Sequence, residues 1–260
     1  MALKLTAALR DMILQGACLK QALSNGVMKW YTGAQPATAE TAPSGTLACV
    51  ISNGSGAVTR EVLSVGSVVL TGGGAGSVNT LTVNGIEIMG SATNFNTSLI
   101  QTATDIVTKI NNNPQNLLFT ASNAAGTSAT ITLTAKPGLG ALANTWAVVA
   151  TPTTITVTNN NMAGGVTAVN GLQWGNAVVG ALIKSPTQVW SGVALQTVSV
   201  GWFRIEAAVA DALTTDGTES VLRLDGSIGI SGAELNMGST AITTGITQTI
   251  AAFTLTLPTD

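Results

Sequence analysis

The sequence predicts a mainly β (α+β) protein, in which an antiparallel β-sandwich scaffold carries an N-terminal helix and is interrupted by an inserted β-α-β domain. Three observations lead to this prediction. Segments of alternating apolar and polar residues, separated by short turns, run through most of the 260 residues. Only two segments have the three-and-four spacing of an amphipathic helix. Glycine-rich stretches flank a central region that has its own helix and strands.

These stretches divide the chain into a split scaffold domain, residues 1–66 and 170–260, and an inserted surface domain, residues 67–169. An insertion requires flexible, exposed junctions. We expect them at the glycine patch 72–76 and at the polar stretch 159–165. A phosphate-binding loop is not expected at the glycine patch, because neither a Lys-Ser/Thr pair nor a helix follows it.

The first element is expected to be a helix over residues 3–24. Its apolar stripe consists of Leu5, Leu9, Met12, Gly16, Leu19 and Leu23. Asn25-Gly26 then supplies a left-handed stop. We expect the stripe to pack on the protein's own sheet. Gly16 would let another backbone approach closely, so docking on a neighbouring protein is the alternative.

The strands of the scaffold follow at regular intervals, which is typical of an antiparallel sandwich. They are expected at residues 27–32, 46–52, 178–184, 188–194, 197–207, 221–227 and 247–257, with a hairpin-type turn at Asn53-Gly54. Four tryptophans lie in this domain: Trp30, Trp174, Trp190 and Trp202. We expect them to anchor the core, and a row of exposed aromatics for stacking sugars or bases is the alternative.

The inserted domain is expected to begin with a strand over residues 78–89 that turns at Asn84-Gly85. A helix should start at the capping pattern Ser98…Gln101 and end before Pro114. Its apolar face would consist of Leu99, Ala103, Ile106 and Ile110. Further strands are expected at residues 117–122, 129–135 and 155–157.

The composition is unusually poor in charge. Charged residues make up 8% of the chain, where about 25% is usual, and the net charge is −2. A surface with so few charges is typical of a protein that is packed against copies of itself or against partner proteins. The basic residues are scattered, so nucleic-acid binding is not expected. No apolar run reaches the ~18 residues of a membrane span, and Arg10 and Asp11 interrupt any signal peptide, so we expect folding in the cytoplasm.

The residues for catalysis are missing from the sequence. It contains no histidine and no recognisable catalytic or dinucleotide motif, so we expect no catalytic residue, no cofactor and no metal. The closest acidic group, Asp211, Asp216 and Glu219, is interpreted as a solvated turn, with a Ca²⁺ site as the alternative. A glycan hydrolase would need two carboxylates positioned on either side of the scissile bond, and no pair of acidic residues in the sequence stands out as a candidate. Cys18 and Cys49 are expected to be buried free thiols.

Several short motifs in the two scaffold halves resemble a small structural protein of tailed-bacteriophage virions. The N-terminal motifs are MALKLTAALR at residues 1–10 and WYTGAQP at 30–36. The C-terminal ones are GWFRI at 201–205, GSIGISGAELN at 226–236 and FTLT at 253–256. The resemblance implies a virion component without catalytic residues, and it does not specify the part of the particle.

The inserted domain is similar to a module of phage surface proteins and to the insert repeat of flagellin and hook-associated proteins. The similarity rests on LTVNGI at residues 81–86, on Ile106 to Asn111, on FTA at 119–121, on ITLT at 131–134 and on GLG at 138–140. In those proteins the module projects outward from an assembled shaft. The resemblance therefore implies an outward-facing insert.

Together these observations predict a non-enzymatic structural component of a tailed-phage virion, most simply an exterior decoration or cement protein of the capsid. A neck or tail (tube or fibre) component is an alternative, and so is a receptor- or glycan-binding module of a tail fibre. The expected partners are copies of the chain and other virion proteins such as the major capsid, neck or tail proteins. The host surface is a further expected partner through the insert, and no nucleic acid or membrane is expected.

Overall fold

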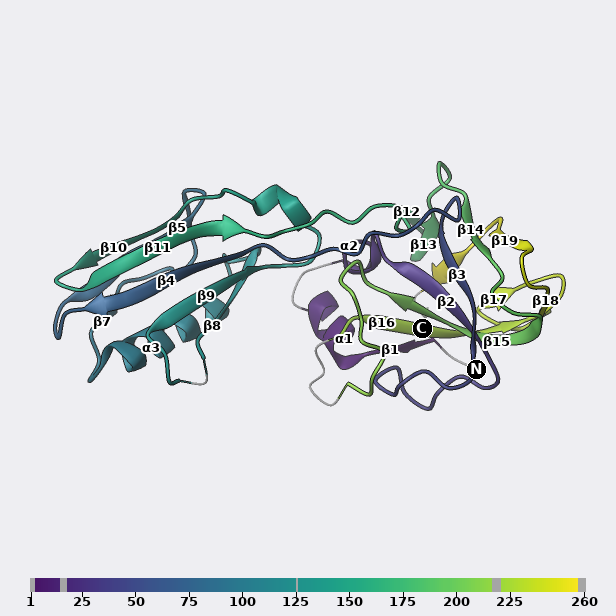
Figure 1. Cartoon of the computed structure of the whole chain (residues 1–260), viewed down its shortest axis with the longest axis horizontal. Helices are drawn as coiled ribbons and strands as arrows, with labels where there is room; N and C mark the ends of the chain where they lie inside the picture. The colour runs from purple at the N-terminus through teal and green to yellow at the C-terminus, as the bar shows by residue number, and fades with distance from the viewer. Residues whose placement is uncertain (1–2, 15–17, 125, 217–220, 257–260) are drawn as a thin grey trace. The chain divides into compact units, whose positions relative to one another are not determined.

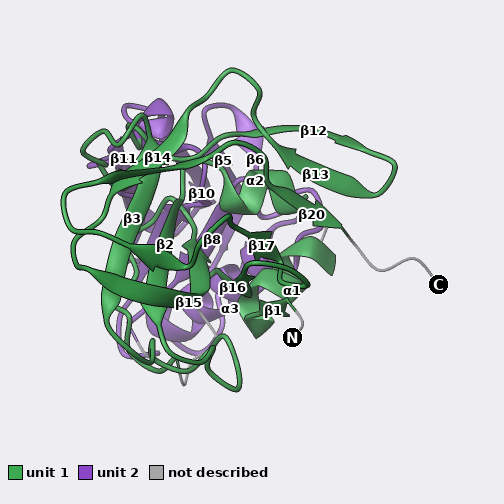
Figure 2. Cartoon of the chain, turned by 90° about the vertical axis from the view of Figure 1, so that its right-hand side faces the viewer, with its two compact units in different colours: residues 1–61, 168–260 green, residues 62–167 purple. Residues whose placement is uncertain are grey.

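The computed structural model describes residues 3–14, 18–124, 126–216 and 221–256. The chain divides into two compact units, which Figure 2 shows in different colours. Residues 1–61 and 168–260 form the scaffold unit, and residues 62–167 form the insert unit. The expected boundaries after residues 66 and 169 differ slightly from this division, because Val65 and Gly66 already belong to a strand of the insert unit.

The scaffold unit begins with a strand, so the expectation of one helix over residues 3–24 is wrong at its start. β1 (Lys4–Leu5) pairs antiparallel with β16 (Arg223–Gly229), and Thr6 extends the pairing by donating its N–H to the Arg223 carbonyl at 3.1 Å. α1 (Ala7–Leu14) and α2 (Leu19–Leu23) follow, and Gly16 lies outside the described residues. Leu9 and Leu23 are buried in the scaffold core, as the apolar stripe predicts. Asn25 has a φ of 61°, which confirms the left-handed stop.

The scaffold is an antiparallel β-sandwich (Figure 1). Its larger sheet has nine strands, and its main path runs β1-β16-β15-β2-β3-β14-β19. These strands are β2 (Val27–Thr32), β3 (Leu47–Asn53), β14 (Trp190–Val193), β15 (Val198–Glu206) and β19 (Thr247–Ile250), with β17 (Leu235–Asn236) and β18 (Ala241–Ile242) attached. The smaller sheet consists of β12 (Trp174–Val178), β13 (Ala181–Lys184) and β20 (Thr254–Thr256). The main core contains residues of both sheets and of both helices.

The four scaffold tryptophans are buried, which confirms that they anchor the fold. Trp30, Trp174 and Trp190 lie in the main core, and the last two meet edge to face with ring centroids 4.9 Å apart. Trp202 is also fully buried, but outside that core. It stacks on Tyr31 at 4.5 Å between ring centroids.

In the part of the insert unit that the structure describes, there are two four-stranded sheets and one long helix. One sheet has the order β11-β4-β9-β8 and the other has β10-β5-β6, with β7 attached to β5. α3 (Leu99–Asn112) begins at Ser98, whose Oγ accepts the Gln101 N–H at 3.1 Å, and it buries Ala103, Ile106 and Ile110 as predicted. The strands are β4 (Val65–Gly72), β5 (Ser77–Val83), β6 (Ile86–Glu87), β7 (Thr93–Asn94), β8 (Phe119–Ser122), β9 (Thr130–Ala135), β10 (Val148–Thr153) and β11 (Thr156–Ala163), and a 3₁₀ turn covers Gly140–Ala143.

The two expected flexible junctions are wrong, because both stretches lie inside the insert unit. The patch Gly72–Gly76 links β4 to β5, and a Cβ at Gly76 would lie 2.0 Å from the Thr153 carbonyl oxygen. Its glycines thus permit a close approach of chains. Asn159 and Asn161 belong to β11, where their Oδ1 atoms accept the N–H groups of Ala150 and Val148 at 3.4 and 3.2 Å. These side chains link the two sheets of the insert.

Candidate functional site

One face of the large scaffold sheet carries charged side chains although it is buried. Side chains alternate between the faces of a strand, so Arg204 and Glu206 of β15 point away from the main core while Phe203 and Ile205 point into it. The same alternation on β16 places Arg223 and Asp225 on the charged face. In the sheet register Arg204 lies opposite Asp225, and Glu206 lies opposite Arg223.

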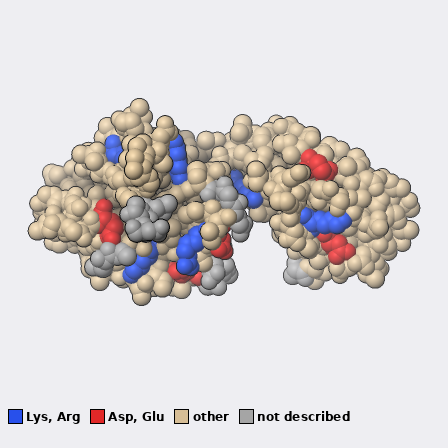
Figure 3. All heavy atoms as spheres, turned by 180° about the vertical axis from the view of Figure 1, so that it is seen from behind, with Lys and Arg blue, Asp and Glu red and all other residues tan. Residues whose placement is uncertain are grey.

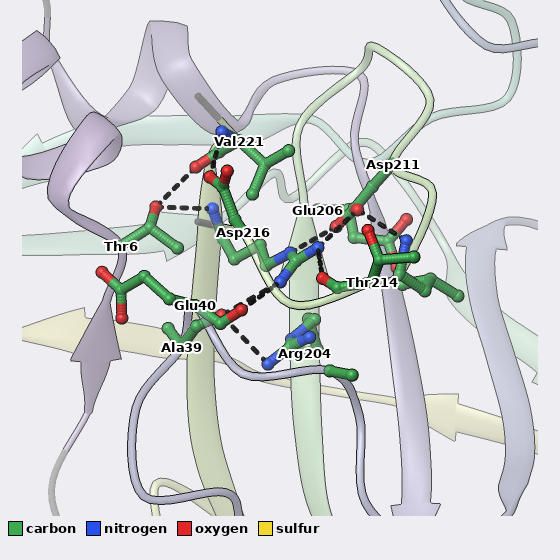
Figure 4. Close-up of polar contacts among 12 residues, drawn as sticks. Thr6, Ala39, Glu40, Arg204, Glu206, Asp211, Thr214, Asp216 and Val221 are labelled. Carbon is green, nitrogen blue, oxygen red and sulfur yellow. Dashed lines mark hydrogen bonds and ion pairs between the residues drawn. The ribbon is translucent and has the colours of Figure 1, made fainter. Parts of the chain in front are cut away.

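The two arginines form paired hydrogen bonds with carboxylates. Figure 4 labels Arg204 and Asp211 among the polar contacts of this region. Arg204 donates from Nε and Nη2 to the two oxygens of Asp225, both at 2.7 Å, and its side chain is fully buried. Arg223 donates from Nε and Nη2 to Asp211 at 2.5 and 2.7 Å. Such two-point pairs have fixed geometry and are stronger than bonds between neutral groups.

Other hydrogen bonds from these arginines hold two loops against the sheet, while Arg204 Nη1 has no partner among the described residues. Arg204 Nη2 donates to the carbonyls of Ala39 and Thr41 at 3.1 and 3.0 Å. Arg223 Nη1 donates to the Glu40 carbonyl at 3.0 Å, and its Nη2 donates to that of Thr214 at 2.8 Å. The loop before β3 and the loop before β16 therefore share one anchoring cluster, which we call the buried charge network.

A third buried carboxylate, Glu206, lies on the same face of the sheet and has its own partners. Glu206 lies 2.7 Å from Lys29 Nζ and 2.8 Å from Arg60 Nη2, and its side chain is 1% exposed. Burial, and next the Glu206 carboxylate, raise the pKa of Tyr31 above its ordinary value. The Tyr31 hydroxyl, the Trp202 Nε1 and the amide of Gln35 have no hydrogen-bond partner within the described chain.

The acidic loop that was interpreted as a solvated turn is partly buried, so this interpretation is wrong for Asp211. The Asp211 side chain is 5% exposed because it pairs with Arg223. Burial raises its pKa, but the bonds from Arg223 and from the Leu213 N–H lower it further, so the pKa lies below the ordinary value. Asp216 accepts the Val221 N–H at 2.8 Å, and Glu219 lies outside the described residues. Within the described ranges no group of three His, Cys, Asp or Glu side chains could hold a metal ion.

Pattern reasoning missed this network, although the sequence contains a signal for it. The runs Arg204-Ile-Glu206 and Arg223-Leu-Asp225 place charges at alternate positions of strands that were expected to be buried on one face. Alternation of this kind shows that the charges share a face. It does not show that loops from elsewhere in the chain cover that face.

The cysteines are both free, but they differ in exposure. Cys49 is buried, and burial raises the pKa of its thiol to about 11. Cys18 is exposed at the start of α2, where its sulfur accepts the Gln21 N–H. The expectation of two buried thiols is therefore wrong for Cys18, because it caps a helix end that points into solvent.

The second feature of interest is the far edge of the large sheet. β19 ends the sheet's main path, and among the described strands it pairs with β14 alone. Exposed edges are normally protected by charges, proline or bulges, yet residues 235–256 contain no charged side chain. Val193, Leu195 and Ile246 lie beside the strand and are 44%, 51% and 56% exposed. We call β19 with these three residues the β19 edge.

A groove of about 540 Å³ opens along this edge. Its lining comes from residues 235–241 on one side and 248–252 on the other, with Trp30 contributing as well. Leu235 and Ile250 are buried beneath it, Met237 and three alanines at 241, 251 and 252 are its more accessible apolar residues, and Asn236 and Gln248 add amide groups. None of the lining residues is charged. We call it the β19 groove.

Comparisons of the chain with protein-family models, with curated proteins and with solved structures find no match. The resemblance to virion proteins therefore stays a prediction. Among the described residues no helix is long and apolar enough to cross a membrane. On the face drawn in Figure 3, charged side chains are few and most of the surface is uncharged.

Proposed function

We propose that the protein is a non-enzymatic structural component of a tailed-phage virion, an exterior decoration or cement protein that binds its neighbours in many copies. The observation that carries this proposal is the β19 edge, a sheet edge with exposed apolar side chains in a segment, residues 235–256, that contains no charged residue. An unprotected edge offers main-chain N–H and C=O groups to another chain. Apolar burial adds about 25 cal/mol per Å², and symmetry repeats each contact through the particle.

The charge distribution of the insert unit also supports the proposal. Residues 62–167 contain four charged side chains, Glu87, Asp105, Lys109 and Lys136, and each is hydrogen-bonded within the unit. Glu87, for example, accepts the Met89 N–H at 2.8 Å and the Gly90 N–H at 3.1 Å. The insert therefore presents a nearly uncharged surface, which suits an outward-facing module in a crowded lattice.

A second function, glycan or receptor binding by the insert, is favoured by one observation. The outer face of the β11-β4-β9-β8 sheet carries a cross-strand row of hydroxyl and amide side chains, Ser122, Thr132, Ser67 and Asn160. Such groups can form hydrogen bonds with sugar hydroxyls. Binding of the isolated insert to host-surface glycans, with no binding of the scaffold to particles, would favour this function over the first.

The proposal is tested by counting and by reconstitution. We expect quantitative mass spectrometry of purified virions to find hundreds of copies, as symmetric shells require. We also expect the purified protein to bind to particles assembled without it. Roughly three to twelve copies, as cyclic assemblies contain, would instead assign the chain to the neck or a fibre. A protein that stays monomeric and does not bind such particles would contradict the structural role.

A further inference from the structure

The hairpin of β12 and β13 ends in an exposed apolar tip. Val178 pairs with Ala181, and the two residues between them, Val179 and Gly180, have φ angles of 49° and 72°. Val178 is 58% exposed and Val179 is 95% exposed. In Figure 2 this hairpin extends outward from the body of the scaffold unit.

The backbone conformation of this turn does not explain why a valine occupies position 179. Two central residues with positive φ define the turn type that favours Asn-Gly, and a β-branched residue is strained there. The chain follows this preference in the β5–β6 turn, where Asn84 and Gly85 have φ angles of 51° and 78°. At Val179 the chain instead combines backbone strain with an exposed apolar side chain. Strain and exposure together are typical of a residue that acts outside its own fold.

The β19 groove and this tip both lack charged side chains. A charged occupant would lose its hydration without gaining an ion partner, because the groove lining is uncharged. The hairpin carries no charge from Trp174 to Ile183. Met237, Ala251 and Ala252 are the more accessible apolar residues of the lining and offer contacts to the valines, and the free edge of β19 offers hydrogen bonds to the main chain of the tip.

We propose that the Val178–Val179 tip of one copy inserts into the β19 groove of a second copy. The tip and the groove are different surfaces of the same unit, so a single contact joins two copies head to tail. If the contact repeats from copy to copy it generates a ring or an open array, and if two copies exchange tips reciprocally it closes a two-fold pair. The inference rests on the proposed self-assembling function and specifies the surfaces that carry it.

Two variants separate the tip from the groove. Val179→Asn places the preferred residue in the turn, so the fold should melt at an equal or higher temperature while the apparent Kd for self-association rises at least about tenfold. Gly238 lines the groove, so the larger side chain of Gly238→Leu should partly fill it. The protein should still fold, because a Cβ at Gly238 would meet no atom within 4 Å. The matched control is Val189→Asn, at an exposed loop valine of the same unit, which should associate like the parent.

The decisive measurement is sedimentation velocity on the full-length variants, alone and mixed. Each variant alone should be monomeric, and an equimolar mixture should give a heterodimer, because Val179→Asn retains a groove and Gly238→Leu retains a tip. If the parent associates and both variants associate equally well, the inference is wrong while the proposed function stands. If the parent neither associates nor binds particles lacking it, both are wrong.

Discussion

At the scale of single residues, the few side chains of the buried charge network hold two loops against the large sheet. Arg204 and Arg223 are at most 1% exposed, so their hydration is lost and must be replaced. Two carboxylates and several main-chain carbonyls supply the replacement. Removing one partner from such a pair leaves an uncompensated buried charge, which is more harmful than replacing both partners.

The first prediction concerns Asp211. Asp211→Asn should lower the free energy of unfolding by about 3 kcal/mol at pH 7, because Arg223 loses its ion partner. The folded-state pKa of Asp211 lies below its unfolded value of about 4, so its contribution is complete above pH ~4 and is lost as the pH falls through the folded pKa. Urea unfolding between pH 2 and 7 should therefore show a weaker acid dependence in the variant.

The control is Asp11→Asn on the exposed side of α1, which should change stability by less than about 0.5 kcal/mol. If Asp211→Asn and the parent have equal free energies of unfolding at pH 7, the ion pair stabilises the fold no more than an uncharged hydrogen bond would.

The second prediction concerns Trp202. Its indole is fully buried, stacks on Tyr31, and has the Arg204 guanidinium carbon 5.5 Å from its ring centroid. Trp202→Ala should lower the free energy of unfolding by about 3–5 kcal/mol through the cavity and the lost stacking. Thermal melting followed by circular dichroism measures this change. A variant that melts like the parent but no longer binds a glycan would support the exposed-aromatic alternative instead.

At the scale of elements, the β19 edge is where assembly is expected to begin. Ile246→Lys should prevent self-association and particle binding, because a lysine beside a free edge opposes strand addition. The side chain is 56% exposed, so folding should be unaffected. Leu117→Lys, at a 67% exposed position of the insert unit, is the matched control. Particle binding that survives Ile246→Lys and is lost in Leu117→Lys would move the contact surface to the insert.

Local signals predicted those elements that local interactions determine. β2 lies at the expected residues, α3 begins at the predicted Ser98 cap, and the turn at Asn84-Gly85 has the expected positive φ angles. β1 was expected to be helical, since Leu5 fits the apolar stripe and its pairing with Leu224 is invisible along the chain. The strands β4 and β10 were missed as well, and β10 contains Pro152 at a register shift. The buried charge network could not be derived because its loops come from distant segments.

At the scale of the whole molecule, the two units have separate cores. Most of the buried apolar residues that the structure describes belong to two clusters, one within each unit, and these clusters share no residue. The scaffold segments also meet at the boundary, where the Thr59 N–H donates to the Val169 carbonyl at 3.1 Å. A short linker can therefore replace the insert at little cost in closure entropy.

The last prediction follows from this organisation. Joining Glu61 to Ala168 through a few Gly/Ser residues should give a folded scaffold, and residues 62–167 alone should fold as well. Circular dichroism with thermal melting tests both fragments, and particle binding tests the shortened chain. A fragment that begins at residue 67 is the comparison, because it lacks Val65 and Gly66 of β4 and should be less stable. An aggregated scaffold beside a soluble parent would show that the units depend on each other.

The interrupted scaffold also has a consequence for synthesis on the ribosome. β2 ends at Thr32 and its partner β15 begins at Val198, so the 165 residues from 33 to 197 are translated between them. At ~5–20 residues per second this delay lasts roughly 10–30 s. During that time the insert can complete the strand pairing of its own sheets. The β2–β3 pair meanwhile exposes Trp30 and Ile51, because β15 has not yet been translated. The nascent N-terminal half is then the segment that a ribosome-associated chaperone would need to protect.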